Sequence, residues 1–393
     1  MFRYLRFYIT PIAGLAISLG LFYGGMWVWM PAFIYVAGAA VLDQFLKKDL
    51  NDEPYGIEFL MDLALYLSLP TAILMFLSLF WAAGSGTQDP LALGIFMQSI
   101  TGHDVFSARD STAWYHYVLM FISLILPATG IGGLAGHELT HRTGKPFDLW
   151  LGRITMALNW GIAFPIEHVY GHHSYVGTTK DPATAARGDS VYQHLPKAMY
   201  RTIVNAWEIE TKRLDKIDSS ILSWNNVLLR MAVISTSTTF LAYYCAGLTG
   251  VAFHLLVCFS TKFALEVLNY VEHYGLIREP DQPVQPRHSW NCNHIVSTVF
   301  TYNLTRHSHH HADAQAPYQD LKAYPDQPEM PNGLASCLLT SLIPGVWRKI
   351  ITPKLVEWDA MYAAKSEYDL IAEANNQSHW PELQGNITKS IAK

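Results

Sequence analysis

The sequence predicts an all-α integral membrane protein with six transmembrane helices and a histidine-rich region outside the bilayer. Three observations lead to this prediction. Half of the 393 residues are hydrophobic and only 15% are charged, against about 25% in a typical soluble domain. Several long stretches carry few or no charged side chains, and most of the 17 histidines gather in two short regions. A surface with so few charges suits lipid better than water.

Net charge and cysteine usage exclude several other classes of protein. The formal net charge is −5 and the chain has no run of basic residues, so we expect no nucleic-acid partner. The four cysteines are scattered along the chain. They form neither a disulfide framework nor a Cys-x-x-Cys metal site.

The first three charge-poor stretches supply the first four spans. Residues 7–42 contain no Asp, Glu, Lys or Arg. Because a span needs about 20 apolar residues, this stretch fits two short spans, with the turn near Gly24, Gly25 and Pro31. Residues 63–88 and 111–136 are also free of these charges. Each of them predicts one further span.

The fourth stretch, residues 231–271, is interrupted only by Lys262 and Glu266, which stand at i and i+4 and can pair within a helix. The glycines in residues 246–250 divide the stretch into two spans. The six predicted helices lie near residues 8–28, 30–46, 59–83, 113–136, 227–246 and 250–271.

Lysine and arginine positions predict the orientation. Basic residues precede the first span and follow the second, whereas the loop between spans three and four has only Arg109. Residues 137–225 hold ten basic side chains. With an even number of spans, both termini and the histidine-rich segments are expected on the cytoplasmic side.

This topology predicts the following organisation of the chain. Two apolar pieces, residues 154–166 and 335–351, are too short to span and are expected against the membrane or the bundle. The polar end of the chain, from Asn375 onward, is expected to be a loose tail. The predicted regions are spans one to four (1–136), a cytoplasmic segment (137–225), spans five and six (226–271), a second cytoplasmic segment (272–365) and the tail (366–393).

The histidines form four short boxes, each at the expected cytoplasmic end of a helix. His137 and His141 stand at i and i+4, so a helix would place both imidazoles on one face. The boxes His-x-x-x-His-His and His-x-x-His-His each offer another such pair and a neighbour. The nine box histidines are His137, His141, His168, His172, His173, His273, His307, His310 and His311.

Nine imidazoles at one membrane depth exceed what one ion can take, so we expect two ions with four or five ligands each. Imidazole suits iron, copper, nickel and zinc, so the ligand type leaves the metal open. Neutral ligands leave the ionic charge uncompensated, and neighbouring acids could balance it and orient ring N–H groups. These acids, which could equally be ordinary solvated side chains, are Glu138, Glu167, Glu272 and Asp313.

Other interpretations of the histidines explain less of the pattern. Residues 137–141 read His-Glu-x-x-His, the zinc protease motif with Glu138 as general base. A protease of this kind would leave most of the box histidines without a role. A metal transporter would need ligands along a path through the membrane, whereas these gather at one face. Isolated histidines, such as His103, His116, His194 and His379, are expected to be structural, while His254 lies inside a predicted span.

The boxes resemble the membrane-bound, histidine-rich di-iron family of desaturases, hydroxylases and monooxygenases. His273, within Asn-Tyr-Val-Glu-His-Tyr-Gly-Leu, is similar to the signature of bacterial alkane 1-monooxygenases. The resemblance covers about residues 1–365. Further matches are Asp-Pro-Ala-Thr from Asp181, His-Ser-Trp-Asn from His288, Asn-His-Ile-Val-Ser from Asn293 and Pro-Tyr-Gln-Asp-Leu from Pro317.

The resemblance implies two iron ions held by the nine histidines, and O₂ as co-substrate. The implied reaction turns a medium-chain n-alkane, O₂ and two electrons into a 1-alkanol and water, in the bacterial inner membrane. A fatty-acyl desaturase or an aryl-methyl hydroxylase of the same superfamily remains an alternative. His309 stands where the family has Asp, so it is expected beside the metal ligands rather than among them. Asp181, His288 and His294 are also expected beside the metal ligands.

Electrons must come from another protein, because the chain has no Gly-x-Gly-x-x-Gly and no Cys-x-x-Cys motif. The resemblance implies rubredoxin, itself reduced by rubredoxin reductase. Basic side chains on the cytoplasmic face could meet its acidic surface. The docking candidates are Arg142, Lys145, Arg187, Arg201, Lys212 and Arg213. The family resemblance suggests that a bulky side chain at the position of Tyr35 limits the chain length of the substrate. Alternatively, Tyr35 serves only in ordinary packing.

Overall fold

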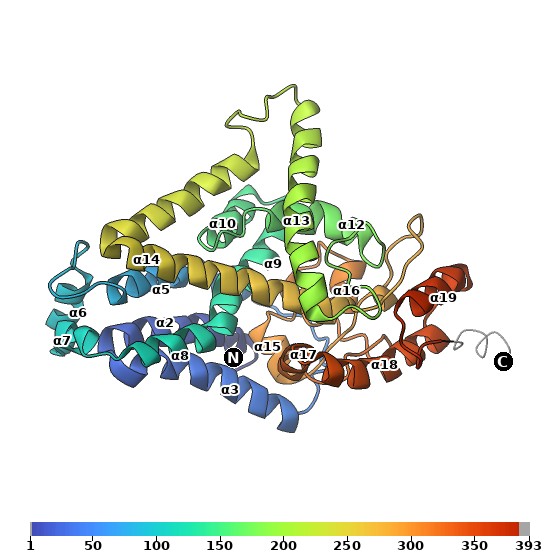
Figure 1. The fold of residues 1–393 in the computed structure, drawn as a ribbon, viewed down its shortest axis with the longest axis horizontal. Helices are drawn as coiled ribbons and strands as arrows, with labels where there is room; N and C mark the ends of the chain where they lie inside the picture. Colours follow the sequence, from blue (N-terminus) through green and yellow to red (C-terminus); the bar gives the residue numbers. More distant parts are fainter. Residues whose placement is uncertain (1, 385–393) are drawn as a thin grey trace. The chain divides into compact units, whose positions relative to one another are not determined.

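The computed structural model describes residues 2–384 and consists of helices joined by turns and loops (Figure 1). No β-strand is assigned among these residues, and only two isolated β-bridges occur. The all-α prediction is therefore confirmed for the part of the chain that the structure describes.

The chain divides into two compact units, each assembled from separate stretches of sequence. Of the described residues, unit 1 comprises 2–41, 55–165 and 214–264, and unit 2 comprises 42–54, 166–213 and 265–384. Four helices have residues in both units: α3 (Met30–Phe45), α11 (Phe164–Glu167), α13 (Val191–Asp215) and α14 (Val227–His273).

Unit 1 holds most of the apolar helices. They are α1 (Phe2–Leu5), η1 (Arg6–Tyr8), α2 (Ile9–Tyr23), η2 (Gly25–Val28), α3 (Met30–Phe45), α4 (Glu58–Tyr66), α5 (Ser68–Ala82), α6 (Leu93–Thr101), α7 (Val105–Asp110), α8 (Trp114–Ala128), the π-helix η3 (Thr129–Leu134), α9 (Ala135–His141), α10 (Pro146–Ala157), the start of α11 (Phe164–Glu167) and most of α14 (Val227–His273).

Unit 2 holds the remaining, mostly shorter helices. They are the π-helix η4 (His168–His172), α12 (His173–Tyr175), α13 (Val191–Asp215), the end of α14, η5 (Pro286–His288), α15 (Ile295–Phe300), α16 (His307–Ala312), η6 (Tyr318–Asp320), α17 (Leu334–Ser341), α18 (Pro344–Met361), η7 (Lys365–Glu367) and α19 (Tyr368–Gln377).

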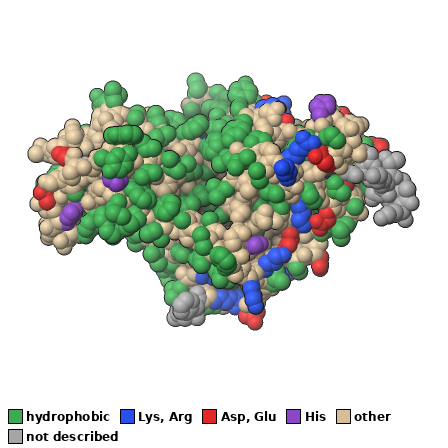
Figure 2. Space-filling model, turned by 60° about the horizontal axis from the view of Figure 1, so that its bottom comes forward, with side chains coloured by type: hydrophobic (Ala, Val, Ile, Leu, Met, Phe, Trp, Pro, Cys, Tyr) green, Lys and Arg blue, Asp and Glu red, His purple; other side chains and the backbone are tan. Residues whose placement is uncertain are grey.

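Among the residues that the structure describes, four helical stretches are long and apolar enough to cross a bilayer: Arg3–Tyr23, Glu58–Ala82, Trp114–His141 and Val227–His273. Apolar helices of this length indicate a membrane protein. The sequence predicts six spans, two more than these four. The counts differ because α3 has only 16 residues, and because both spans predicted for residues 227–271 fall within the single 47-residue stretch of α14. Large hydrophobic side chains lie exposed on the helices, as a lipid-facing surface requires, and they cover much of the face shown in Figure 2.

Helix α14 is broken where the sequence predicts a turn. Ala246 and Gly247 have non-helical backbone angles, with φ of −146° and 59°. Gly247 can take the second value because it has no Cβ. Figure 1 shows the two arms of α14 meeting at a sharp bend. A Cβ on Gly250 would lie 2.2 Å from the Ala242 carbonyl oxygen, so glycine is also needed for the close approach at the bend.

Small residues allow the helices of unit 1 to pack closely. A Cβ on Gly136 would lie 2.6 Å from Met156, and one on Gly152 would lie 2.8 Å from the Gly136 carbonyl oxygen. This contact presses α10 against α9, the helix that carries the first two box histidines. The apolar piece at residues 154–166 therefore lies against the helical bundle, as predicted.

The C-terminal segment is packed where a loose tail was predicted from Asn375 onward. Asn375 is buried, and its side-chain oxygen accepts a hydrogen bond from Arg187 at 2.6 Å. Leu383 is fully buried. The prediction is wrong for residues 375–384, because buried contacts hold this polar segment; the remaining residues, 385–393, lie outside the described part of the chain.

Candidate metal centre

The first pair of box histidines lies at the end of a continuous helical stretch in unit 1. Helix α8 passes through the π-helix η3 into α9 without a break. His137 and His141 stand one turn apart on α9 and are both buried, and their Nε2 atoms are 3.2 Å apart. The predicted i, i+4 pairing is confirmed.

The second box is arranged differently from the i, i+4 expectation. Residues 168–172 form a π-helix, η4, in which position i lies above i+5 instead of i+4. As a result, the Nε2 atoms of His168 and His173 face each other at 3.1 Å. The ring of His172 meets the ring of His273 edge to face, 4.7 Å apart at the centroids. The π-helix therefore divides this box between two groups.

One group of four buried histidines lies entirely within unit 2. His172, His273, His307 and His311 each offer a ring nitrogen, and these nitrogens lie within 4.8 Å of one another. The Nε2 atom of His307 is 2.9 Å from Nε2 of His273 and 3.2 Å from Nε2 of His311. Helices η4, α14 and α16 supply these side chains.

The remaining box histidines of unit 2 form a second group of three, His168, His173 and His310, whose ring nitrogens also lie within 4.8 Å of one another. The rings of His173 and His310 are 4.7 Å apart at their centroids. The third box is thus split like the second: His307 and His311 belong to one group and His310 to the other.

The spacing of the donor atoms fits metal ions. With imidazole–metal bonds of about 2.0–2.1 Å, neighbouring nitrogens around one ion are about 2.8–3.0 Å apart in octahedral geometry and about 3.3–3.4 Å apart in tetrahedral geometry. The observed Nε2–Nε2 separations of 2.9 to 3.2 Å fall between these limits. Several converging neutral imidazoles cannot all donate to one another, so a shared cation explains the arrangement better than hydrogen bonding does.

Asp181 orients one ring of the four-histidine group. Its Oδ2 atom lies 2.9 Å from Nδ1 of His172, and both side chains are buried. The backbone N–H of Ala183 and the hydroxyl of Thr184 donate to the same carboxylate. With Nδ1–H donated to Asp181, Nε2 of His172 is free for a metal, and it has no hydrogen-bond partner among the described residues.

The acids of the other boxes occupy different environments. Glu272 is buried, with Oε2 at 3.5 Å from Nε2 of His307. Glu167 is also buried, beside Gly171. Glu138 forms an ion pair with Arg142 at 3.4 Å. A carboxylate engaged by a guanidinium is a poor general base, which disfavours the zinc protease interpretation.

Four of the residues expected beside the metal ligands belong to neither histidine group among the described residues. Asp313 is exposed and accepts from the Gln315 backbone. His309 accepts at Nδ1 from the Lys322 backbone N–H. The Nδ1 atom of His294 lies 3.0 Å from the Asp43 carbonyl oxygen, and the Nε2 atom of His288 lies 3.1 Å from the Glu367 carboxylate.

Two of the predicted docking cations are withdrawn from the surface. Arg187 is buried and binds Asp359 through both terminal nitrogens, at 2.8 and 2.7 Å. Its assignment as a docking residue is therefore wrong, because it is neither accessible nor uncompensated. Arg142 is mostly buried among Asp62, Glu138 and Asp148. Burial alone would lower the pKa of Arg142, but these carboxylates raise it overall.

The other predicted docking cations lie at the surface. They are Lys145, Arg201, Lys212 and Arg213. Arg213 also pairs with Glu210 at 2.7 Å.

Tyr35 lies inside unit 1 beside the helix that ends in the first histidine pair. Its hydroxyl is 3.1 Å from Thr10 Oγ1. A Cβ on Gly130, in the π-helix η3, would lie 3.7 Å from the same hydroxyl. Tyr35 therefore faces the stretch of helix that immediately precedes His137.

Arg306 is a positioning residue to which the sequence analysis gave no role. It precedes His307 and is buried. Its guanidinium donates to the carbonyls of Asp49 and Asn51 and to the Asp52 carboxylate, at 3.0, 3.1 and 3.2 Å. These bonds tie the start of α16 to residues 49–52. An arginine directly before a histidine box was the only signal in the sequence.

The isolated histidines stand apart from both groups among the described residues. His254 is buried in α14 between the Thr239 hydroxyl and the Leu158 carbonyl. His116 accepts at Nδ1 from the Trp29 indole N–H at 3.0 Å, and the His194 ring lies tilted against that of Tyr270, 5.6 Å apart at the centroids.

Comparisons with known proteins agree with this arrangement. Residues 112–337 match the family described as Fatty acid desaturase. The chain is 33% identical to Alkane 1-monooxygenase 1 of Pseudomonas aeruginosa, covering 79% of this chain and 76% of the relative. It is 30% identical to the alkane 1-monooxygenase of Pseudomonas putida over 89% and 83% of the two chains. It is also 30% identical to the xylene/toluene monooxygenase hydroxylase component XylM of Pseudomonas putida, over 96% of each chain.

The histidine groups and the family match define a histidine-rich membrane oxidoreductase of the desaturase superfamily. Within that class, the chain belongs to the alkane 1-monooxygenase family and is a monooxygenase.

Proposed function

We propose that this protein is an alkane 1-monooxygenase that hydroxylates the terminal methyl group of medium-chain n-alkanes at a di-iron centre. The observation that carries this proposal is the division of the box histidines of unit 2 into two groups, each with metal-ligand spacing and with all members buried except the partly buried His173. Two groups support two ions, and the alkane monooxygenase relatives support iron and an alkane.

The proposed ligands are the nine box histidines. The four-histidine group would hold one iron. His137 and His141 would join His168, His173 and His310 around the other, because three imidazoles alone leave an incomplete ligand set and the pair on α9 already has the required 3.2 Å spacing. Glu272 and Asp181 would offset part of the charge of the first ion, since both are buried beside its ligands.

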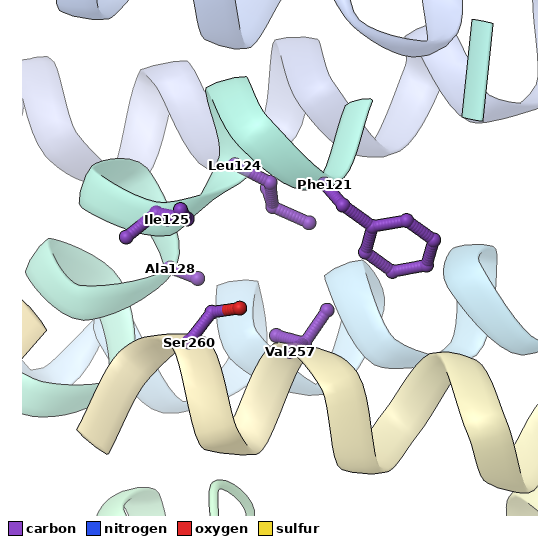
Figure 3. Close-up of a pocket in the computed structure, with 6 residues that line it drawn as sticks. All are labelled: Phe121, Leu124, Ile125, Ala128, Val257 and Ser260. Carbon is purple, nitrogen blue, oxygen red and sulfur yellow. The ribbon is translucent and has the colours of Figure 1, made fainter. Parts of the chain in front are cut away.

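When bound, the irons and O₂ supply the oxidising power for the reaction. The residues of this chain hold the ligand rings in place and keep the site dry. Asp181 fixes which nitrogen of His172 faces the metal. Buried apolar side chains around α8 and α14 (Figure 3) would exclude water, so that the C–H bond of a bound alkane is the bond that reacts.

We also propose the membrane topology and location. Helix α3 and the two arms of α14 would bring the number of spans to six, with both termini and the histidine segments on the cytoplasmic side of the bacterial inner membrane. The basic residues of residues 137–225 support this orientation. The five regions predicted from the sequence would then be the membrane and cytoplasmic segments in the order in which they follow one another along the chain.

Rubredoxin is the proposed electron donor. Lys145, Arg201, Lys212 and Arg213 are exposed and could meet its acidic surface. Tyr35 is proposed to limit the chain length of the substrate, because its hydroxyl lies beside Gly130 on the way to His137.

A second candidate activity is hydroxylation of methyl groups on aromatic rings. It is favoured by the match to the xylene/toluene monooxygenase component, which extends over nearly the whole of both chains. Turnover of octane and of toluene by the same preparation would separate the two activities. An excess of 1-octanol over benzyl alcohol supports the alkane assignment, and the reverse supports the aryl-methyl one.

The deciding experiment is metal analysis of the purified protein together with an assay for 1-octanol. We expect two irons per chain and O₂-dependent 1-octanol formation with reduced rubredoxin. The variant His273→Ala should lose iron and activity, whereas His379→Ala, which changes an exposed histidine outside both groups, should keep both. One zinc per chain, or full iron and rate in His273→Ala, would overturn the proposal.

A further inference from the structure

Four buried residues of unit 2, residues 289–292, form a short segment that contains no proposed metal ligand. Ser289 has extended backbone angles, with φ of −144° and ψ of 144°, and all four residues are buried. The segment forms hydrogen bonds with the end of α14, which carries His273, and with the start of α16, which carries His307. We call it the spacer segment.

Trp290 binds the backbone on both sides of His273. Its backbone N–H donates to the Glu272 carbonyl at 2.9 Å, and its indole N–H donates to the Tyr274 carbonyl at 3.0 Å. The last carbonyls of a helix have no partner within the helix, and α14 ends at His273. Because Trp290 is only 1% exposed, water cannot replace it as the donor. The rigid indole ring therefore fixes the stretch of backbone from which the imidazole of His273 projects.

The other residues of the spacer segment bind the start of α16. The backbone N–H of Cys292 donates to the Thr305 carbonyl at 2.8 Å. Ser308 donates its hydroxyl to the Ser289 carbonyl at 3.3 Å and its backbone N–H to Oδ1 of Asn291 at 3.4 Å. Helix α16 has only six residues, and a helix this short has little stability of its own. Contacts with the spacer segment therefore help to decide where its histidines lie.

Asn291 ties the spacer segment to a third part of unit 2. Its side-chain amide donates to the Ala323 carbonyl, and its backbone N–H donates to the Pro328 carbonyl at 2.8 Å. Its own carbonyl accepts from the Met330 backbone N–H, also at 2.8 Å. The spacer segment is therefore held by three parts of the chain, and it cannot shift with either helix end without breaking buried hydrogen bonds.

The spacer segment accounts for a close approach that the covalent chain does not impose. His273 and His307 are 34 residues apart, yet their Nε2 atoms lie 2.9 Å apart. Trp290 binds the backbone around the first histidine, and its neighbours in the same segment bind the backbone around the second. Ligands that must stay within about 0.5 Å of their working positions depend on supporting contacts of this kind.

We propose that residues 289–292 are a positioning element for the four-histidine group, and that Trp290 is the positioning residue for His273. The effect of Trp290 is confined to this group, because the group of His168, His173 and His310 takes no ligand from α14 among the described residues. The identity of the metal as iron rests on the proposed function, whereas the role of Trp290 rests on its own two hydrogen bonds.

The test compares two variants that each remove one buried indole N–H. Trp290→Phe removes the bond to the Tyr274 carbonyl. Trp358→Phe is the matched control, because Trp358 is also fully buried and donates its indole N–H to the Arg287 carbonyl at 2.7 Å, which does not flank a proposed ligand. Each variant leaves one buried carbonyl without its donor, so both should lower the melting temperature by a similar amount.

The measurement that separates the two variants is iron release from the iron-loaded, full-length protein to a ferrous chelator under anaerobic conditions. In Trp290→Phe we expect one iron per chain to leave about tenfold faster than in wild type, while the other leaves at the wild-type rate. The Mössbauer spectrum should change for one iron site only. In Trp358→Phe both irons should keep the wild-type rate and spectrum.

The positioning role would be overturned by equal acceleration of both irons in Trp290→Phe, by the same release rates in both variants, or by no change. If Trp290→Phe does not fold, as judged by its melting curve, benzothienylalanine at position 290 provides the second test. It keeps the size of the ring and replaces the N–H by sulfur, so the same selective release is expected, and an unchanged rate counts against the role. Wild-type protein that binds two irons but forms no 1-octanol would contradict the proposed function and leave the positioning role standing.

Discussion

His168 and His173 face each other with their Nε2 atoms 3.1 Å apart, although they stand five residues apart in sequence. The ring of His168 also stacks on the ring of its i+4 neighbour, His172, at 4.9 Å between centroids. Across the π-helix, however, the Nε2 atom of His168 meets that of His173, while the His172 ring lies 4.7 Å from the ring of His273. The wider turn of the π-helix thus decides which ring nitrogens can share an ion.

Deleting Tyr170 should convert this π-helix to a regular helix in which His168 and His173 are four residues apart and still share a face. Tyr170 is 47% exposed, so its side chain contributes little to packing. We therefore expect the deletion variant to keep both irons, measured as iron per chain in purified protein. Tyr170→Ala is the matched control and should also keep both irons; a deletion variant that loses iron while Tyr170→Ala does not would show that the π-helix itself is needed.

Asp181→Asn should loosen the metal that His172 helps to hold, because an amide cannot fix the ring tautomer as a carboxylate does. Removal of such a partner costs about 10- to 100-fold in metal affinity. The rate of iron loss to a chelator measures this change. Asp313→Asn alters an exposed acid near the third box and should lose iron at the wild-type rate.

Glu367 should contribute a pH-dependent part of the stability of unit 2. Burial raises its pKa, but hydrogen bonds from His288, the Ala364 N–H and Arg287 lower it overall. A carboxyl with a depressed pKa stabilises the folded state above its unfolded value of 4.5, and this contribution is lost as the pH falls through the lower folded value.

The variant Glu367→Gln should therefore be less stable than wild type at pH 7, by about 2 kcal/mol, because the partly buried Arg287 loses its charged hydrogen-bond partner. The difference in melting temperature should shrink at pH values below 4.5. Glu382→Gln removes an ion pair at the surface, with Arg348, and should change the melting temperature little. A constant difference between Glu367→Gln and wild type across this pH range would contradict the assignment.

Cys292 and Cys337 should resist alkylation in the native protein. Both thiols are buried, and burial raises the pKa of Cys292 to about 11 and that of Cys337 to about 12. At pH 8 only about one thiol in a thousand or fewer is then the reactive thiolate. Iodoacetamide followed by mass spectrometry should modify them only after denaturation, and rapid modification of the native protein would show that the segment opens.

Charge reversal at Arg201 and Lys212 should weaken the interaction with rubredoxin. Both side chains are exposed on α13. We expect the double variant to raise the KM for rubredoxin about tenfold and to reduce the dependence of the rate on salt. Lys365→Glu reverses an exposed charge outside the predicted docking set. Equal KM values for the double variant, Lys365→Glu and wild type would place the docking site elsewhere.

The sequence alone determined the class of this protein. Charge-free stretches predict apolar helices because hydropathy is a local property, and the break in α14 follows from its glycines in the same way. The pair His137 and His141 could be predicted because an i, i+4 spacing fixes a common face on any α-helix. The spacing and number of the box histidines therefore predict two metal ions from the sequence alone.

Tertiary structure decided which side chains share an environment. Arg187 is buried because Asp359, 172 residues away in sequence, pairs with it, and the same network holds Asn375 in a segment that looked like a loose tail. The partition of the second box between the two groups of histidines depends on the π-helix at residues 168–172. Neither result follows from local spacing, because burial and helix register depend on contacts between residues that are distant in the chain.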